Sequence, residues 1–160
     1  MEIRHAGMRD LEAVHALEKI CFPPLEAASK ESFRARISSF PNHFWLMYEG
    51  DTLICFVNGF VTDRETLTDE MFENASLHDE NGAWQMIFGV DTHPDYRNRG
   101  CASSLLEKVI EDAKADGRKG VILTCKEKLI PFYARLGFET EGLSVSEHGG
   151  AVWYQMKITF

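Results

Sequence analysis

Apolar residues in the first part of the chain recur at helical spacing. Residues 1–5 are typical of a short strand, and residues 10–21 of a helix. The apolar face of that helix repeats every three residues, at Leu11, Val14, Leu17 and Ile20. Prolines at 23–24 end it, because proline lacks the backbone N–H that a helix needs. Ser29 is a suitable N-cap, so we expect a second helix to begin there.

The middle of the chain carries apolar runs that predict strands. The runs at 44–48 and 53–61 flank Glu49-Gly50-Asp51, which is typical of a hairpin turn. Residues 63–82 are polar and acidic, and we expect them to form a surface excursion with about one turn of helix. The next apolar run, residues 83–92, predicts one further strand.

The last part of the chain predicts two helices and three strands. A regular apolar face, ended by Gly117, consists of Ala102, Leu105, Leu106, Val109, Ile110 and Ala113. Residues 121–125 predict a buried strand and 129–136 a short helix, and 139–146 with 151–158 predict a final hairpin. The order β-α-α-β-β-β-α-β-α-β-β indicates an α+β fold with a mixed sheet. We expect one domain covering residues 1–160.

Composition narrows the class of partner. The chain has 160 residues, of which 44% are hydrophobic and 26% charged, so a folded domain with a sizeable core is expected. The formal net charge of −8 disfavours a nucleic-acid partner, because phosphate contacts need clustered lysine and arginine. The same acidic balance favours a cationic substrate such as an amine.

The cysteines and the apolar runs bear on the compartment. The four cysteines, Cys21, Cys55, Cys101 and Cys125, have no C-x-x-C spacing, so no metal site and no redox motif are expected. We interpret them as reduced thiols in a cytoplasmic protein. Residues 1–5 lack the apolar core of a signal peptide, and no apolar run is long enough to cross a bilayer. We therefore expect no membrane partner.

The segment 97–103, Arg-Asn-Arg-Gly-Cys-Ala-Ser, has the features of an anion site. It follows an apolar strand and opens an apolar-periodic helix. Backbone N–H groups are unpaired at a helix N-terminus, where the helix dipole adds partial positive charge. Gly100 and Ala102 leave the backbone open to a pyrophosphate. A plain glycine turn that binds no ligand is the alternative for this segment alone.

A second motif lies downstream. Leu123-Thr124-Cys125 precedes residues 130–138, Ile-Pro-Phe-Tyr-Ala-Arg-Leu-Gly-Phe. With the loop at 97–103, this motif resembles the GCN5-related N-acetyltransferases (GNAT superfamily), which bind acetyl-CoA at a loop of pattern R/Q-x-x-G-x-G/A. The resemblance implies the GNAT fold, a mixed and mostly antiparallel sheet whose central strands splay apart around the cofactor, with flanking helices.

Three segments narrow the resemblance within that superfamily. Residues 60–68, Phe-Val-Thr-Asp-Arg-Glu-Thr-Leu-Thr, and residues 123–127, Leu-Thr-Cys-Lys-Glu, are similar to segments of arylalkylamine (serotonin-type) N-acetyltransferases. Residues 23–29, Pro-Pro-Leu-Glu-Ala-Ala-Ser, are similar to a segment of polyamine-acetylating enzymes. The likeness covers most of the chain from about residue 22 onward.

The resemblance also assigns the cofactor-binding residues. The backbone N–H groups from Asn98 through Gly100, Cys101 and Ala102 to Ser103 would hold the pyrophosphate of acetyl-CoA, with charge added by Arg97 and Arg99. The backbone of Val90, Asp91 and Thr92 would pair with the pantetheine amides as an added strand. We interpret Cys101 chiefly as a small spacer residue in the loop.

Tyr133 is the first candidate for a catalytic side chain. In the family this tyrosine lies beside the thioester sulfur, and a neutral phenol can protonate a departing thiolate. The alternative is a core tyrosine packed between Phe132 and Phe138.

The general base is harder to assign. Arylalkylamine enzymes carry two histidines in an H-x-H pattern, and the corresponding positions here are Met86 and Phe88, which cannot accept a proton. Glu26 is the candidate, either as the base or as the ammonium ligand, with a plain helix-end charge as the alternative. His78, His93 and Asp91 are further possibilities, and so is a water chain.

An acceptor pocket could be lined by apolar residues, namely Phe22, Leu25, Phe60, Trp84 and Phe88, although large aromatic residues in strands are equally typical of a core. The sequence therefore predicts an acetyl-CoA-dependent transferase that acetylates the primary amine of a small molecule by direct attack in a ternary complex. An amino sugar or a protein N-terminus as acceptor, or a non-catalytic acyl-CoA sensor, are the alternatives. A homodimer is possible.

Overall fold

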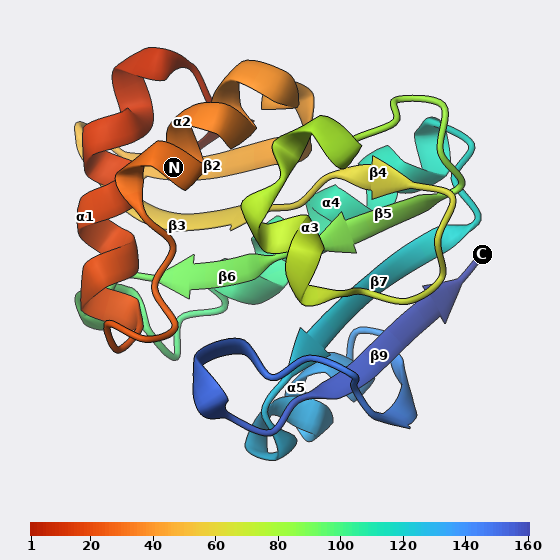
Figure 1. Ribbon diagram of the computed structural model, residues 1–160. Coiled ribbons are helices and arrows are strands. Elements are labelled where there is room, and N and C mark those ends of the chain that lie inside the picture. Colours follow the sequence, from red (N-terminus) through yellow and green to blue (C-terminus); the bar gives the residue numbers. More distant parts are fainter.

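The computed structural model describes all 160 residues, whose strands form two sheets that meet at the centre of the molecule (Figure 1). The first sheet is antiparallel throughout. Its strands lie in the order β1 (Glu2–His5), β2 (Phe44–Glu49), β3 (Thr52–Asn58) and β6 (Gly89–Thr92).

The second sheet is mixed, because β5 and β7 run parallel while its other neighbouring strands are antiparallel. Its strands lie in the order β4 (Val61–Thr62), β5 (Trp84–Ile87), β7 (Gly120–Cys125), β9 (Tyr154–Thr159) and β8 (Glu139–Leu143). The predicted α+β class and the mostly antiparallel mixed sheet are confirmed.

The central strands separate within the segment that the sequence predicts as one strand, residues 83–92. In the structure it is two strands, and the prediction of a single strand is wrong. β5 pairs with β7 as far as Ile87 and Leu123, whereas β6 leaves that sheet and pairs with β3. Beyond Leu123, Thr124 and Cys125 pair with β9 alone. A V-shaped opening therefore lies between β6 and the end of β7.

The predicted strand at residues 53–61 is also interrupted, next to the point where β5 gives way to β6. The predicted strand 53–61 is β3 followed by β4, with Gly59 and Phe60 between them. A Cβ at Gly59 would lie 1.9 Å from the carbonyl oxygen of Met86, so the two backbones approach in a way that only glycine permits. The chain therefore crosses between the two sheets twice, from β3 to β4 and from β5 to β6, and the two crossings are neighbours.

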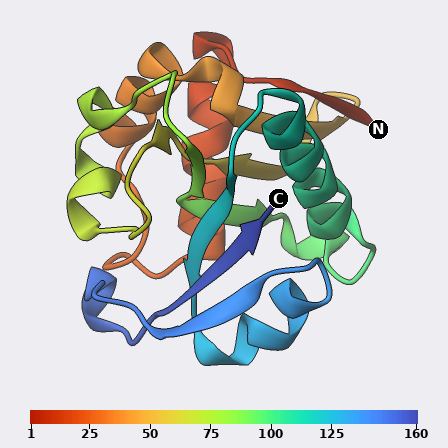
Figure 2. The same ribbon diagram turned by 90° about the vertical axis from the view of Figure 1, so that its right-hand side faces the viewer.

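Helices cover both faces of the strands. α1 (Leu11–Cys21) and α2 (Lys30–Ser39) pack on one side of the first sheet, and α4 (Cys101–Ala115) lies on the opposite side, as Figure 2 shows. Ser29 caps α2 as predicted, since its hydroxyl accepts from the Ser32 N–H at 3.1 Å. The prediction that Ile20 faces the core is wrong, because it is 56% exposed. A three-residue spacing lags the helical period of about 3.6 residues, so the fourth position has turned away.

The segment 63–82 is more than a surface excursion. It contains α3 (Asp69–Glu73) and a 3₁₀ turn, η3 (Ala75–Leu77), in front of β4 and β5 (Figure 1). Leu67 and Met71 are buried against Phe40, Phe60 and Trp84. The segment therefore packs on a separate hydrophobic cluster of the protein.

The C-terminal part closes the second sheet. After β7 come a 3₁₀ turn, η5 (Glu127–Leu129), and α5 (Ile130–Ala134), and then the predicted hairpin of β8 and β9 around the 3₁₀ turn η6 (His148–Gly150). Three other 3₁₀ turns are η1 (Met8–Asp10), η2 (Pro41–His43) and η4 (Pro94–Tyr96). None of the helices combines the length and apolar character that a membrane crossing requires.

Candidate active site

A cavity of ≈ 1000 Å³ occupies the opening between the two sheets. One part lies against β6, the end of β7 and the start of α4. The other part lies against the loop from α1 to α2, against α3, and against the loop before β9. We call these the loop side and the acceptor side of the cavity. Segments that are far apart in the sequence therefore share one pocket.

The loop at 97–103 is built as the sequence predicts. Asn98 (φ 61°) and Gly100 (φ 78°) adopt left-handed backbone conformations, and Gly100 is the N-cap of α4. The first N–H that bonds back to the loop is that of Ser104, to the Gly100 carbonyl at 2.9 Å. The backbone N–H groups of residues 98–103 have no acceptor within the protein. With the dipole of a 15-residue helix behind them, these groups have the arrangement that binds anions at helix N-termini.

The side chains of this loop differ in where they point. Asn98, Ala102 and Ser103 line the cavity, and so does Cys101, which is otherwise buried in the core. Arg97 also lines it, with its Nε donating to the Thr92 carbonyl at 3.2 Å. Arg99 instead stacks over the Tyr96 ring at 5.2 Å and lies outside the lining, so its predicted contact is not supported.

β6 offers its free edge to the cavity. Its other edge is bonded to β3, and Val90 and Thr92 line the pocket. The side chain of Asp91 does not face the cleft. It is 0% exposed, on the α1 side of the sheet, because alternate residues of a strand point to opposite faces. Among the predicted strand residues, Asp91 could therefore contact a cofactor only through its backbone.

Tyr133 lies at the junction of core and cavity. It is 6% exposed, lines the pocket, and packs edge-to-face between Phe132 and Phe138 with ring centroids 5.0 and 5.8 Å away. Its hydroxyl has no partner within the protein. Burial raises the pKa of Tyr133 above its ordinary value, as do the neighbouring Cys125 and Asp91. The phenol is therefore neutral and free to donate a hydrogen bond.

Glu26 lines the acceptor side, but its carboxylate is already engaged. Lys126 Nζ lies 3.0 Å from both carboxylate oxygens and donates a hydrogen bond to Oε2, whereas the buried Oε1 has no hydrogen-bond donor. The backbone carbonyl of Glu26 accepts from His148 Nε2 at 2.7 Å. This hydrogen bond connects the loop before β9 to the loop after α1. The acceptor side is therefore lined by segments from both ends of the chain.

The apolar lining of the acceptor side matches the prediction in part. Phe22, Leu25 and Phe88 line the cavity. Trp84 and Phe60 do not, because they are buried in the core beneath α3, and their assignment to the pocket was wrong. Sequence reasoning missed three aromatic side chains, Phe72, His148 and Trp153.

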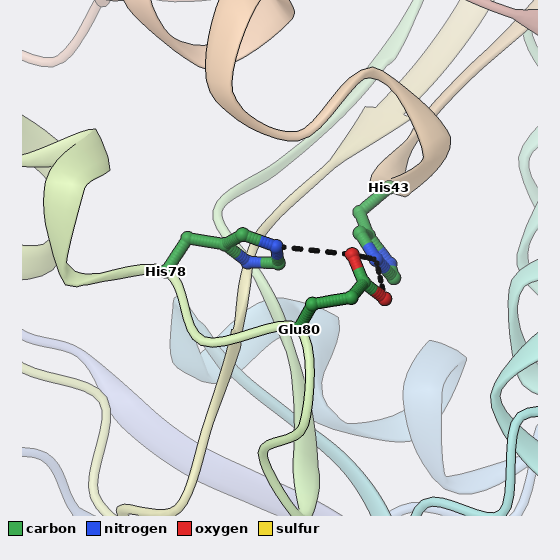
Figure 3. A group of neighbouring side chains, drawn as sticks. All are labelled: His43, His78 and Glu80. Atoms are coloured by element: carbon green, nitrogen blue, oxygen red, sulfur yellow. Dashed lines mark hydrogen bonds and ion pairs between the residues drawn. The ribbon is translucent and has the colours of Figure 1, made fainter.

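The two histidines considered as bases lie elsewhere. His93 Nδ1 accepts from the Asp95 N–H at 3.1 Å and so caps the turn η4. His78 belongs to a cluster with His43 and Glu80 at the other end of β5 (Figure 3). None of the four residues His43, His78, Glu80 and His93 lines the cavity.

The hydrogen bonds of this cluster fix its protons. Gln85 Nε2 donates to three backbone carbonyls, so its Oε1 must accept from His43 Nδ1, at 2.8 Å. His43 Nε2 lies 3.0 Å from both carboxylate oxygens of Glu80 (Figure 3). His78 Nδ1 accepts from the Val61 N–H, so its Nε2 carries the proton that faces Glu80.

With His43 Nδ1–H donated to Gln85, the lone pair of a neutral His43 ring lies on Nε2, whereas the lone pair of His78 Nδ1 accepts from the Val61 N–H. Only His43 and Glu80 could therefore bind an ion here, which is fewer protein ligands than metal sites usually have. Arg118 Nη2, 2.8 Å from Glu80, already supplies positive charge. Burial alone would raise the pKa of Glu80, but the hydrogen bond and charge of His43 lower it below its ordinary value. The cluster is an internal ion-pair network.

Two buried charged residues of the acceptor side were missed by the sequence analysis. Glu18 and Arg36 are 6% and 4% exposed, and both line the cavity. The sequence contains a signal for the burial of Glu18: it follows Val14 by four residues and so lies on the buried face of α1. A charge on an apolar face points to a built polar site.

The family assignment rests on a model of the Acetyltransferase (GNAT) family, which matches residues 11–138. The chain belongs to this family. The predicted superfamily and fold are confirmed.

Two curated relatives of this GNAT domain are similar over part of their length. The serotonin N-acetyltransferase of Mesocricetus auratus is 28% identical over 96 residues, covering 59% of this chain and 45% of the relative. An uncharacterized N-acetyltransferase of Methanocaldococcus jannaschii is 40% identical over 106 residues, covering 59% and 42%. The matches span less than half of either relative.

Solved structures share the fold over the whole chain. The GphF GNAT-like decarboxylase in complex with isobutyryl-CoA superimposes with a TM-score of 0.87 at 20% identity, covering 99% of both chains. The ribosomal-protein-S18-alanine N-acetyltransferase of Escherichia coli gives 0.71 at 16% identity, covering 99% of this chain and 92% of that one. At sequence identities this low, the structural similarity shows a shared fold and nothing more.

Proposed function

We propose that this protein transfers the acetyl group of acetyl-CoA to the primary amine of a small molecule with an apolar body, an arylalkylamine or a polyamine. One observation carries the proposal. A single cavity joins an anion-binding helix N-terminus to an aromatic chamber with carboxylates at its edge. A cofactor with a pyrophosphate and a cationic acceptor suit the two sides.

The loop side fits the cofactor. Six consecutive backbone N–H groups have no acceptor within the protein and are therefore available to the phosphates of CoA. The free edge of β6 would bond the pantetheine amides in the same way. Bound acetyl-CoA supplies an activated acetyl thioester at the opening between the sheets.

The acceptor side fits an apolar body that carries a cation. Phe22, Phe72, Phe88 and Trp153 provide apolar surface, and Asp69 and Glu73 line the same part of the cavity. An arylalkylamine would bury its ring there at little entropic cost, whereas an amino sugar would bring many hydroxyls that need partners.

Direct attack by the amine is the mechanism that the side chains favour. Burial raises the pKa of Cys125, which lines the cavity, to about 11, and that of Cys21 above its ordinary value. Both thiols are thus protonated near neutral pH and are poor nucleophiles. Tyr133 would donate its phenolic proton to the departing thiolate.

An acceptor panel tests the proposal through the rate of thiol release from acetyl-CoA. We expect phenethylamine and tryptamine to give the highest kcat/KM, with polyamines close behind and aminoglycosides and peptide N-termini well below. Equal kcat/KM for an aminoglycoside and phenethylamine would contradict the proposed acceptor class but not the proposed acetyltransferase activity. Cofactor binding without thiol release for any amine would favour the acyl-CoA sensor.

A further inference from the structure

A group of buried ionisable side chains lies next to the acceptor side of the cavity. Glu18 comes from α1, Arg36 from α2 and Asp91 from β6. Their exposed fractions are 6%, 4% and 0%. Three such groups in one place are costly to bury unless they neutralise one another.

Glu18 is the member of this group with a carboxylate open to the cavity. Its Oε2 accepts from the Ala28 N–H at 2.9 Å, which fixes the side chain in place. Its Oε1 has no donor within the protein, and Glu18 lines the cavity. One oxygen is therefore held by the fold, and the other is available to a ligand.

Asp91 lies behind Glu18 and has no contact with the cavity. Neither of its carboxylate oxygens has a hydrogen-bond donor, although both are buried. Burial raises the pKa of Asp91 well above its ordinary value, and the neighbouring Glu18 carboxylate raises it further. Asp91 therefore keeps its proton near neutral pH and can donate it in a hydrogen bond to Glu18.

Arg36 supplies the balancing charge. It donates from Nη1 to Asn58 at 3.0 Å and from Nη2 to the Phe72 carbonyl at 2.8 Å, while its Nε has no acceptor. Burial lowers the pKa of Arg36 to about 10, with Glu18 and Asp91 acting against that shift, so it remains a cation at neutral pH.

Two cysteines complete the surroundings of Asp91. Burial raises the pKa of Cys21 on α1 above its ordinary value and that of Cys55 on β3 to about 12, so both are neutral. The group then holds a positive charge on Arg36 and a proton on Asp91, next to the carboxyl group of Glu18.

We propose that Glu18 is the general base that this enzyme needs, with protonated Asp91 as its hydrogen-bonding partner. This inference rests on the proposed amine acetylation. The two positions that hold histidines in arylalkylamine enzymes are Met86 and Phe88, and the carboxylate of Glu26 is paired with Lys126. The other carboxylates that line the cavity are Glu73, which is exposed, and Asp69, which accepts hydrogen bonds at both oxygens. Glu18 is therefore the buried carboxylate with an oxygen that no donor or cation of the protein contacts.

The proton transfers balance as follows. An N–H bond of the acceptor ammonium breaks, and an O–H bond forms on Glu18 Oε1, which leaves a neutral amine. The amine lone pair forms the C–N bond to the acetyl carbon, and the C–S bond breaks. The thiolate takes a proton from Tyr133, which recovers one from the attacking nitrogen. Glu18 then releases its proton to water.

The test compares Glu18→Gln with two matched variants. Glutamine keeps an oxygen for the Ala28 N–H but cannot act as a base at neutral pH. Glu12→Gln is the control, since Glu12 lies on the same helix with a 77% exposed side chain outside the cavity. Asp91→Asn imitates the protonated acid. Folding is checked by circular dichroism and cofactor binding by calorimetry.

We expect Glu18→Gln to lower kcat for phenethylamine by about 10²- to 10⁴-fold, which is typical for loss of a general base. Raising the pH should restore part of the rate. A fluorinated ethylamine that is mostly neutral at the assay pH should lose far less. Asp91→Asn should stay within about tenfold of wild type, and Glu12→Gln should match it.

Three kinetic outcomes would overturn the assignment: a folded Glu18→Gln enzyme with the wild-type rate and pH profile, an equal loss for both amines, or a large loss in Asp91→Asn with none in Glu18→Gln. Carboxyl ¹³C NMR tests the pair without turnover. A carboxyl carbon in its acid form at pH 7 that disappears in Asp91→Asn supports the proposal, and a fully ionised Asp91 contradicts it. Failure of the proposed acetylation would instead show as an inactive wild type.

Discussion

At the scale of single residues, the cavity separates groups that bind from groups that move protons. Tyr133 is held by two aromatic rings and keeps a hydroxyl without a partner. Glu26 is held by Lys126, so its carboxylate acts on the charge and shape of the acceptor side. The role of each side chain thus depends on the residues that contact it.

Replacing Tyr133 with phenylalanine tests the proton donor. The hydroxyl acts on charge that develops at sulfur, so its loss should reduce kcat by about 10²- to 10⁴-fold and leave the affinity for acetyl-CoA nearly unchanged. Single-turnover kinetics with calorimetric cofactor binding provide the measurement. If the variant kept the wild-type single-turnover rate, Tyr133 would be a packing residue.

At the scale of elements, the anion site depends on the turn before α4. We expect Gly100→Val to weaken cofactor binding about 10- to 100-fold, because hydrogen bonds to a charged group contribute about 1.5–3 kcal/mol. Gly50→Val is the matched control, since Gly50 has a similar φ of 57° and no atom within 4 Å of a Cβ, yet lies in the β2–β3 turn. Equal calorimetric affinities for the two variants would argue against the loop as the cofactor site.

The opening between the sheets depends on the close approach at Gly59. Gly59→Ala should destabilise the protein by about 1–3 kcal/mol or more, since the new methyl would meet the Met86 carbonyl at 1.9 Å. Gly7→Ala, whose nearest neighbour would lie at 3.9 Å, should be close to neutral. Urea unfolding compares the two, and similar midpoints would show that this backbone contact is not required.

Much of the fold and half of the site were readable from the sequence, for identifiable reasons. Helix and strand periods and the loop at 97–103 are local signals, and they were found. The break at Phe88, the burial of Trp84 and the place of Glu18 depend on which strand or helix lies next to them. Apolar patterns do not distinguish a core aromatic residue from one that lines a cavity.

At the scale of the whole molecule, the buried acid Asp91 ties stability to pH. Its pKa is raised in the folded protein by burial, so the unfolded chain loses that proton first as the pH rises. Stability should therefore fall with increasing pH above the ordinary aspartate value of about 3.9. Asp91→Asn should remove this contribution, so its melting temperature should exceed that of wild type at pH 7 and converge with it near pH 4. A constant difference between the two proteins across that range would contradict a protonated Asp91.

The central claim is that both sides of the cavity work together in one acetyl transfer. The most direct measurement follows wild-type protein with acetyl-CoA and phenethylamine, and quantifies free thiol and N-acetylated amine by mass spectrometry in the same sample. We predict that both products appear at equal rates well above that of the uncatalysed reaction. If calorimetry showed bound cofactor while neither product rose above background, the claim would be contradicted.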